Sequence, residues 1–481
     1  MVSPGTNSPI AADLLISLER GDGGEGRGRG ALHQQLEAGI RDAIRSGRLP
    51  QGAALPPTRA FATELGVSRG VVVEAYAQLV AEGYLNSRSG GYTRVAAASS
   101  GEAGAARAPA DSRTRPKPSV DFGYGRANVA AFPRAAWLRS VRTALTEAPD
   151  ERLGYLDGHG TIELRQALTE YLNRIRGTVA IADNVAITNG YAQGVALLLG
   201  VLAARGARRL AVEDPSANDD ARVIAAGLGL DVVGVPVGPE GVRIDALAQL
   251  DADALILTPS HQWPTGAVLS APARAAVVGW ARARGALIIE DDYDAEFRYD
   301  RTPVGAIQGL APELVAYAGT ASKTLAPGFR LGWFVLPAQL VQPFAEAKLL
   351  ADRGSPVLDQ LTFADFLRRG EFDRHLRRLR PVYRARRDAL VAALAQRLPQ
   401  LRPAGIAAGL HLVTWLPAEL DETEVVQAAA AQGVAVVGLE PYRVAPSAAG
   451  GLIFGYSTIA ETAIHRGIGL LADAIAELSR R

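Results

Sequence analysis

Cysteine is absent from this chain of 481 residues, so disulfide bridges, thiolate metal sites and cysteine nucleophiles are excluded. Long apolar runs are also missing: the most apolar helical stretch, VALLLGVLAA at 195–204, is far shorter than the roughly 20 residues that span a bilayer. The first residues, MVSPGTNSPIAADLL, show no basic segment followed by a long apolar run, which argues against a signal peptide. We therefore expect a soluble, cytoplasmic protein with no metal site and no membrane contact.

Neither sign of charge dominates the chain as a whole, whose formal net charge is +1. The distribution of charge is uneven, however. Residues 27–95 hold nine arginines against five acidic residues, a local charge of +4, which leaves about −3 for the remainder. Basic charge gathered at one end is a weak indication of a polyanionic partner.

The composition divides the chain into three zones. Residues 28–95 show short helical patterns, and residues 96–118 are small, polar and proline-bearing, as in a linker. Residues 119–481 alternate short apolar strands such as RRLAVED, LDVVGVPV, ADALILTPS and GALIIEDD with amphipathic helices. That alternation predicts an α/β fold with a largely parallel sheet covered by helices, followed by a smaller C-terminal subdomain from about residue 352.

The first zone contains patterns for three short helices and a hairpin. Apolar side chains at a four-residue spacing predict the first helix: Leu32, Leu36, Ile40 and Ile44. Thr58 and Ser68 are expected to cap the next two helices, with a glycine turn at Gly66 between them. The last of these helices is expected to bury Val72, Tyr76, Leu79 and Val80. A two-stranded wing with a Gly90-Gly91 turn is expected over residues 85–95.

This order of elements predicts a winged helix-turn-helix. In such a motif the start of the second helix meets the major groove, so Arg59, Ser68 and Arg69 are predicted to contact phosphates and base edges. The alternative is a small helical domain whose arginines only solvate its surface. The continuous stretch LPPTRAFATELGVSRGVVVEAYAQLVAEGYL resembles the winged-helix domain of GntR-type bacterial regulators. That resemblance implies that double-stranded DNA is a partner.

Lysine is scarce in this chain, and one of the few stands in the stretch YAGTASKTLAPGFRLGW. A nucleophilic lysine needs a partly neutral amine held toward an electrophile. Pyridoxal 5′-phosphate (PLP) supplies an aldehyde for such a lysine, and it also needs hydroxyls and an arginine for its phosphate. Thr320 and Ser322 stand beside Lys323, and Arg330 follows on the far side of a loop.

An acid opposite the pyridine nitrogen is a further requirement for PLP. The predicted strand in GALIIEDDYDAEF ends near Asp291 and Tyr293, and ligands of open α/β sheets gather beyond the carboxyl ends of the strands. Another strand, in VAITNGYAQG, leads into a helix whose first backbone N–H groups are predicted to hold the phosphate: Gly190, Tyr191 and Ala192. Taken singly, each of these features is more often an ordinary surface or strand-end feature.

The joint order of glycine turn, Pro-Thr-Gly turn, Asp-x-Tyr, Ser-Lys and Arg resembles the fold type I aminotransferases, from about residue 121 to the C-terminus. The segment LGYLDGHGTIELRQALTEYLNRIRG is similar to the early helical segment of that family. Behind a GntR-like head and a linker, the arrangement resembles the MocR/GabR-type PLP-dependent transcriptional regulators, which implies a homodimer.

The resemblance also implies a role for each site residue. Lys323 is expected to bind the PLP aldehyde covalently, Asp291 to pair with the pyridine nitrogen, and Tyr293 to approach the ring oxygen. The phosphate is expected to be held by Thr320, Ser322 and Arg330.

The chain departs from the aminotransferase pattern at three places. Trp263 stands where an asparagine usually precedes the Pro-Thr-Gly turn. Ser216 and Ala217 replace a Gly-Tyr pair after EDP, which leaves Tyr191 as the candidate to stack on the cofactor ring. Ile453, in LIFGY, replaces the arginine of a pattern such as LRLGF. Without that arginine the carboxylate of an amino acid loses its bidentate partner.

Three functions remain open. The leading one is a transcription factor whose large domain senses PLP or an amino compound, with PLP itself as the favoured effector and PLP synthesis or salvage as the controlled process. The second is an active aminotransferase with an incidental head, against which Ile453 counts. The third is a DNA-binding protein whose large domain has lost its cofactor and serves dimerisation, against which Lys323, Asp291 and Arg330 count.

Overall fold

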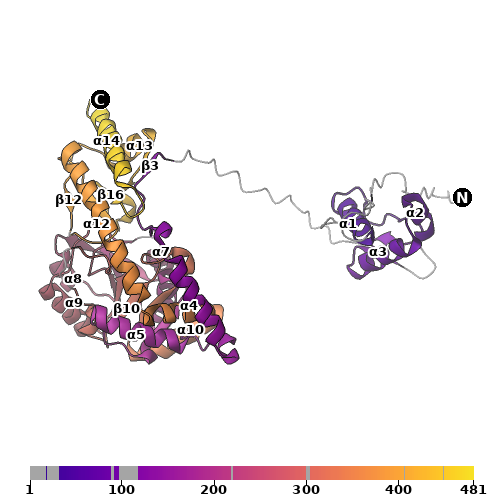
Figure 1. Cartoon of the computed structure of the whole chain (residues 1–481), viewed down its shortest axis with the longest axis horizontal. Coiled ribbons are helices and arrows are strands. Elements are labelled where there is room, and N and C mark those ends of the chain that lie inside the picture. The colour runs from indigo at the N-terminus through magenta and orange to yellow at the C-terminus, as the bar shows by residue number, and fades with distance from the viewer. Residues whose placement is uncertain are drawn as a thin grey trace. The chain divides into compact units, whose positions relative to one another are not determined.

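The computed structural model describes residue 18 and residues 32–87, 92–96, 118–217, 220–299, 304–405, 407–447 and 449–480. The chain forms two compact units, Met1–Thr114 and Arg115–Arg481 (Figure 1). Three expectations fall outside the described residues: the N-terminal segment, the Gly90-Gly91 turn, and the predicted linker apart from its two end residues. Among the described residues, no helix is both long and apolar enough to cross a membrane.

Three helices and a two-stranded wing form the small unit. Helices α1 (Leu32–Arg45), α2 (Thr58–Leu65) and α3 (Arg69–Ala81) precede the antiparallel strands β1 (Leu85–Asn86) and β2 (Arg94–Val95). The helices contribute these side chains to one buried cluster: Leu36, Ile40, Phe61, Val72, Ala75, Tyr76 and Leu79. The elements and their order are those of a winged helix-turn-helix, as the sequence predicts.

Details at the helix starts and in the buried stripe differ from the prediction. Thr58 is the first residue of α2 and does not cap it, because Pro57 holds the cap position. Ser68 does hold the cap position of α3, but its side chain accepts no hydrogen bond from the helix. Both starts are exposed, so water can satisfy the first N–H groups. Val80 is 36% exposed and Ala75 is buried in its place, because a 3.6-residue period turns position 80 away from the core.

An eight-stranded sheet organises the large unit, in the order β4-β11-β10-β9-β8-β5-β6-β7. Its strands are β4 (Val185–Thr188), β5 (Arg209–Asp214), β6 (Asp231–Gly238), β7 (Gly241–Val242), β8 (Ala254–Leu257), β9 (Leu287–Asp292), β10 (Val315–Thr320) and β11 (Gly332–Val335). The pairs from β10 through β9, β8 and β5 to β6 are parallel, and the outer pairs are antiparallel. The carboxyl ends of the central strands therefore meet at one edge.

Helices cover both faces of this sheet because its strands are apolar on both faces. On one face, α6 (Tyr191–Ala204), α7 (Asp220–Gly227) and α10 (Ala338–Asp352) pack on side chains such as Val212 and Ile289. On the other face, α8 (Ile244–Gln249) and α9 (Ala271–Arg284) pack on the alternate positions, such as Ala211 and Ile288. Helices α4 (Arg134–Glu147) and α5 (Ile162–Arg176) belong to a third cluster, which extends into the C-terminal part.

The C-terminal part begins with α11 (Val357–Arg368) and the long helix α12 (Glu371–Arg397). It continues as a sheet in the order β12-β13-β16-β15, with α13 and α14 beside it. These elements are β12 (Pro403–Ala404), β13 (His411–Trp415), α13 (Glu422–Ala431), β14 (Val434–Ala435), β15 (Val437–Gly438), β16 (Gly451–Gly455) and α14 (Glu461–Leu478). The first strand of the large unit, β3 (Val120–Asp121), pairs with β14 and lies near α13 and α14 (Figure 1).

Candidate functional site

A cavity of about 290 Å³ lies at the carboxyl ends of β5, β8, β9 and β10, the edge at which open α/β sheets bind ligands. The cavity is lined by all but one of the residues that the sequence assigns to a cofactor: Tyr191, Ala192, Asp291, Tyr293, Thr320, Ser322, Lys323 and Arg330. The remaining one, Gly190, directly precedes α6. Segments far apart in the sequence thus supply one pocket, and the cofactor roles of these residues remain a prediction.

Lys323 follows the buried end of β10, which stops at Thr320. Its Nζ donates a hydrogen bond to the carbonyl oxygen of Gly125, at 2.7 Å. The hydroxyl of Thr320 accepts from the backbone N–H of Ser322 at 3.1 Å and lies 3.0 Å from the Ser322 hydroxyl. The turn after β10 therefore places two hydroxyls and the amine at the same end of the pocket.

Arg330 and Gly190 form the corner in which a phosphate is expected. Arg330 adopts a left-handed backbone, with φ of 50°, and its Nη2 donates to the carbonyl of Asn189 at 2.7 Å. Gly190 has φ of 88°, and a Cβ there would lie 2.6 Å from Nη2 of Arg330, so only glycine fits. Helix α6 begins at the next residue, and its N-terminus adds partial positive charge to that of the guanidinium. This corner suits an anion.

Asp291 is at the end of β9, and its carboxyl group accepts no hydrogen bond from any residue that the structure describes. Burial, followed by the charge of Asp292, raises the pKa of Asp291 to about 8, and the opposite charge of Lys323 offsets part of this rise. A half-buried acid without a donor, facing a cavity, suits a partner that brings its own N–H or accepts the acid proton.

Asp292, the next residue, does not line the cavity, and its hydrogen bonds hold the end of β9 in place. Its Oδ2 accepts from Nε of Arg176 at 2.6 Å and from the hydroxyl of Tyr317 at 2.7 Å. Arg176 also donates to the hydroxyl of Ser260 at 2.8 Å, so this ion pair bridges α5, β9 and the segment after β8. This buried network, in which Oδ1 of Asp292 has no hydrogen-bond partner among the described residues, limits the positions that Asp291 can take.

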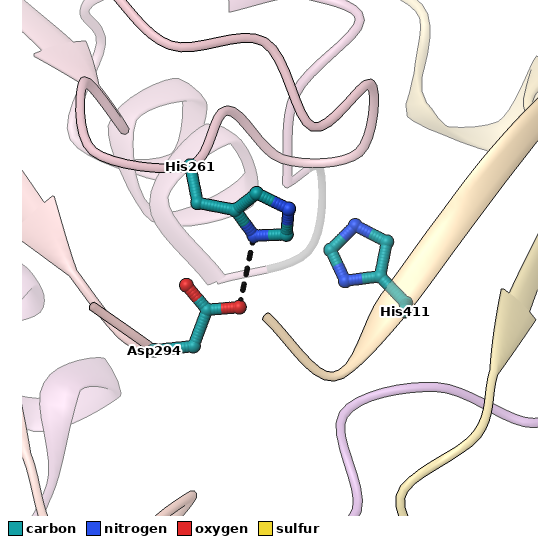
Figure 2. Close-up of side chains that lie close together, drawn as sticks. All are labelled: His261, Asp294 and His411. Atoms are coloured by element: carbon teal, nitrogen blue, oxygen red, sulfur yellow. Dashed lines mark hydrogen bonds and ion pairs between the residues drawn. The ribbon is translucent and has the colours of Figure 1, made fainter. Parts of the chain in front are cut away.

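Behind Tyr293, two histidines and Asp294 lie together (Figure 2). His261 Nδ1 lies 2.9 Å from Asp294 Oδ2, and Nε2–H of His411 donates to the carbonyl of Pro264 at 3.0 Å. Burial, and then the neighbouring His261, lower the pKa of His411 well below its usual value, so its imidazole is neutral. The hydroxyl of Tyr293 donates to the carbonyl of His261 at 3.1 Å. Because these hydrogen bonds hold the two histidines, Asp294 and Tyr293 in place, we interpret the cluster as a structural support for the pocket wall.

Aromatic side chains form the wall that faces the C-terminal subdomain. The rings of Tyr124 and Trp263 have centroids 4.2 Å apart, and Tyr442 lies edge-on to both. The hydroxyls of Tyr124 and Tyr442 hydrogen-bond to each other. Ile453 is fully buried behind this wall, in one apolar cluster with Trp263 and Tyr442. The two departures from the aminotransferase pattern, at 263 and 453, thus lie in one apolar cluster.

The sequence interpretation missed several lining residues: Tyr124, Gly125, Glu213, Thr258, His411 and Tyr442. Oε2 of Glu213 accepts from the backbone N–H and the hydroxyl of Thr258, at 2.9 and 2.7 Å, and burial raises the pKa of Glu213 to about 7. The signal that could have revealed Glu213 is a lone acid at the end of an otherwise apolar strand, RLAVED. His411 likewise stands in an apolar strand, LHLVTW.

In the small unit, the predicted DNA contacts are at exposed helix starts. Arg59 is the second residue of α2, Ser68 is the residue before α3, and Arg69 is its first residue. All three side chains are exposed. In the part of the chain that the structure describes, neither arginine has an ion-pair partner, so both guanidinium groups remain available to a phosphate or a base edge.

Both units of the chain match known protein families. Residues 127–450 match the family "Aminotransferase class I and II", and residues 32–95 match "Bacterial regulatory proteins, gntR family". The "Probable rhizopine catabolism regulatory protein MocR" of Rhizobium meliloti is 32% identical over 93% of this chain and 94% of its own length. The "HTH-type pyridoxine biosynthesis transcriptional regulator PdxR" of Corynebacterium glutamicum is 32% identical over 92% of this chain and 96% of its own. The chain belongs to the MocR-type transcriptional regulators.

The large unit of this MocR-type regulator also resembles solved aminotransferases. An archaeal alanine:glyoxylate aminotransferase is 25% identical with a TM-score of 0.68, and the match covers 74% of this chain and 91% of that one. The fold prediction, a winged helix-turn-helix followed by a fold type I aminotransferase-like domain, is therefore confirmed.

Proposed function

We propose that this MocR-type regulator binds operator DNA through its winged helix-turn-helix and senses PLP in the pocket of its large unit. The observation that carries the proposal is the set of charged groups in the pocket. Arg330 is the one arginine among the described residues that line it. If Arg330 holds a phosphate, no second guanidinium remains in that wall for a carboxylate. An amino-acid effector then lacks its usual partner, whereas PLP brings a phosphate, a pyridine nitrogen and an aldehyde.

Arg443 and Arg134 are two further candidates to bind the carboxylate of an amino acid, but their contacts do not fit that role. Arg443 donates to the carbonyl of Ala449 and lies 3.8 Å from the carboxylate of Glu440. Nη1 of Arg134 donates a long hydrogen bond, of 3.5 Å, to the carbonyl oxygen of Ala130. Neither side chain lines the pocket, and this supports PLP over an amino acid as the effector.

The chain's own groups match each part of PLP, which when bound supplies an electrophilic aldehyde and an electron-withdrawing ring. Asp291 pairs with the ring nitrogen, for which its unpartnered carboxyl group is suited. Tyr293 lies beside the ring hydroxyl, and Lys323 takes the aldehyde. Arg330 binds the phosphate with help from the N-terminus of α6 and the following hydroxyls: Thr320 and Ser322.

The proposed signal is the occupancy of Lys323, and the proposed target is PLP synthesis or salvage. The relative PdxR carries pyridoxine biosynthesis in its name, which supports this target. An effector acts only through different affinities for two states of the protein, so apo and PLP-loaded forms must differ in operator binding.

The test uses the full-length protein with DNA from its own promoter region. Borohydride reduction after PLP addition should place the pyridoxyl group on Lys323 by peptide mapping. Operator affinity should differ between apo and loaded protein, and Lys323→Ala should remove most of the difference. γ-Aminobutyrate and other amino acids should change neither the visible absorbance nor DNA binding. An amino acid that changes both at modest concentration would show that the effector is an amino compound.

An active aminotransferase is the second candidate, favoured by the likeness to the alanine:glyoxylate enzyme and by the lysine and aspartate in the pocket. The assay is transfer of an amino group from amino acids to 2-oxo acids by the loaded protein. We expect no turnover above that of free PLP, because Ile453 closes the region in which a carboxylate-binding arginine is expected. Multiple turnovers with any amino acid would favour the enzyme.

A further inference from the structure

Residues 118–126, here called the anchor segment, connect the end of the predicted linker with the pocket. The segment begins beside β14: the N–H of Ser119 donates to the carbonyl of Gly433 at 2.8 Å, and that of Phe122 to Ala435 at 2.9 Å. The carbonyl of Phe122 accepts from the N–H of Gly455 on β16 at 2.7 Å. The segment is therefore fastened to the C-terminal subdomain along its first half.

The second half of the anchor segment forms part of the pocket. Tyr124 and Gly125 both line the cavity. Gly125 has φ of 74°, and a Cβ on it would lie 3.3 Å from Nζ of Lys323, so a glycine lets the backbone approach the amine. Its carbonyl oxygen accepts the hydrogen bond from Nζ at 2.7 Å. Among the described residues, Lys323 is the one donor to this oxygen.

Covalent attachment of an aldehyde changes the donor in this contact. A lysine ammonium carries three N–H bonds. On condensation a C=N bond forms, two of these hydrogens leave with the aldehyde oxygen as water, and one N–H remains on the positively charged nitrogen. That N–H lies in the plane of the new double bond, so its direction is set by the bound aldehyde and no longer by Gly125.

We propose that the hydrogen bond from Lys323 to Gly125 holds the anchor segment while the amine is free, and that condensation with the aldehyde releases the segment from the pocket. The inference rests on the proposed function, in which PLP is that aldehyde. It adds the route by which occupancy of the lysine reaches the chain that leads to the DNA-binding unit. The residues released are those of the second half, 123–126, which directly follow the strand from which that connection leaves. Residues 119–122 keep their hydrogen bonds to Gly433, Ala435 and Gly455.

Amide hydrogen exchange of the full-length protein, followed by peptide mass analysis, tests the release. In the wild type, PLP should speed exchange of peptides covering 119–126 by roughly tenfold, the effect on local opening expected when a hydrogen bond from a charged donor is lost. Lys323→Ala removes the donor and should exchange fast with or without PLP. Lys323→Arg keeps a cationic donor that cannot condense, and it should exchange slowly in both conditions. Peptides from α8 and α9, which contribute no residue to the pocket, are the internal control and should not change.

The outcomes separate this inference from the proposed function. If no adduct forms on wild-type Lys323, PLP sensing fails, while the comparison of apo Lys323→Ala with apo wild type still decides whether the lysine holds the segment. If the adduct forms and operator affinity changes but exchange at 119–126 stays constant or slows, the anchor proposal is overturned and PLP sensing stands. Equal exchange in apo Lys323→Ala and apo wild type would also overturn it.

Discussion

At the scale of single residues, the buried carboxyl groups near the pocket stand out because their pKa values are raised. Burial raises the pKa of Glu213 to about 7 and, with the help of Asp292, raises that of Glu290 to about 7 and that of Asp291 to about 8. Through these groups the folded apo protein binds more protons near neutral pH than the unfolded chain does, whereas His411, whose pKa is lowered, acts in the opposite sense below its unfolded pKa of about 6.5. These carboxyl groups stabilise the fold below their unfolded pKa values, and this stability is lost as the pH rises toward about 8.

We expect the free energy of unfolding of the apo large unit to fall as pH rises from about 6.5, above which the histidines no longer oppose the effect, to about 8, by up to roughly 1.4 kcal/mol per pH unit for each such group. Asp291→Asn should make the fall shallower, because one titrating group is removed. Urea unfolding followed by tryptophan fluorescence measures this, since all five tryptophans are in the large unit. The control is Asp183→Asn, at a carboxylate that is 90% exposed, which should keep the wild-type slope. A stability that rises over this range would contradict the assignment.

Arg330 allows a second prediction at this scale. Arg330→Gln should weaken PLP binding by roughly 1.5–3 kcal/mol, the usual contribution of hydrogen bonds to a charged group. Titration of apo protein with PLP, followed by visible absorbance, gives the affinity. Arg353→Gln is the matched control, because Arg353 is the other described non-glycine residue with a left-handed backbone, at φ of 61°, and it does not line the pocket. Equal losses in both variants would trace the effect to backbone strain.

The sequence allowed the lining residues on the lysine side of the pocket to be predicted, because their order along the chain is specific and most of them stand at or near a strand end. Tyr124, His411 and Tyr442 were not predicted, because they come from a loop after β3, the start of β13 and a short 3-10 helix, three separate parts of the chain. Their proximity depends on how the subdomain packs against the sheet, and no local pattern encodes that packing. Trp263 and Ile453 were recognised as departures, but their contact within one apolar cluster needed the structure.

At the scale of elements, helix α3 carries the main prediction for DNA. Arg69 is its first residue and is exposed, so Arg69→Ala should weaken specific operator binding by roughly 1–3 kcal/mol if the side chain reads a base. Arg48→Ala removes the same charge from an exposed position just after α1 and is the control. Arg48→Ala should reduce DNA affinity less than Arg69→Ala does, and by the same factor for operator and scrambled DNA. Fluorescence anisotropy on operator and scrambled DNA measures both, and equal effects of the two variants would move base recognition elsewhere.

Most elements of the large unit followed from apolar patterns, since buried parallel strands such as β5, β8 and β9 are short and continuous. The order of the strands in the sheet could not be predicted, because the spacing of apolar residues does not indicate which strands become neighbours. The pairing of β3 with β14 could not be predicted either, because a strand of two residues is too short to show an apolar pattern. In the small unit, the predicted caps failed at Thr58 and Ser68, where water can replace the side-chain oxygen.

At the scale of the whole molecule, we expect a homodimer. Leu138 and Leu145 are 60% and 59% exposed and lie two turns apart on one face of α4, and Tyr155, further along the chain, is 92% exposed. Exposed apolar side chains that gather on one helix face are typical of a protein interface, so we expect this face to be covered in the dimer. Sedimentation at micromolar concentration should give twice the chain mass. Leu138→Glu should shift the equilibrium toward monomer, while Val223→Glu, at a 68% exposed position on α7, should leave it unchanged. A monomeric wild type would contradict the prediction.

Pairing of Val120 with Val434 also sets the order of events during synthesis. The winged helix-turn-helix is built from contacts among Leu18 and residues 32–96 and can fold as soon as it leaves the ribosome. Strand β3 must wait for β14, which at about 5–20 residues per second takes on the order of tens of seconds. During that interval the nascent chain presents a complete winged helix-turn-helix with an unfinished large unit. A ribosome that stalls late in the message would therefore leave a product that still binds operator DNA but no longer responds to the proposed effector.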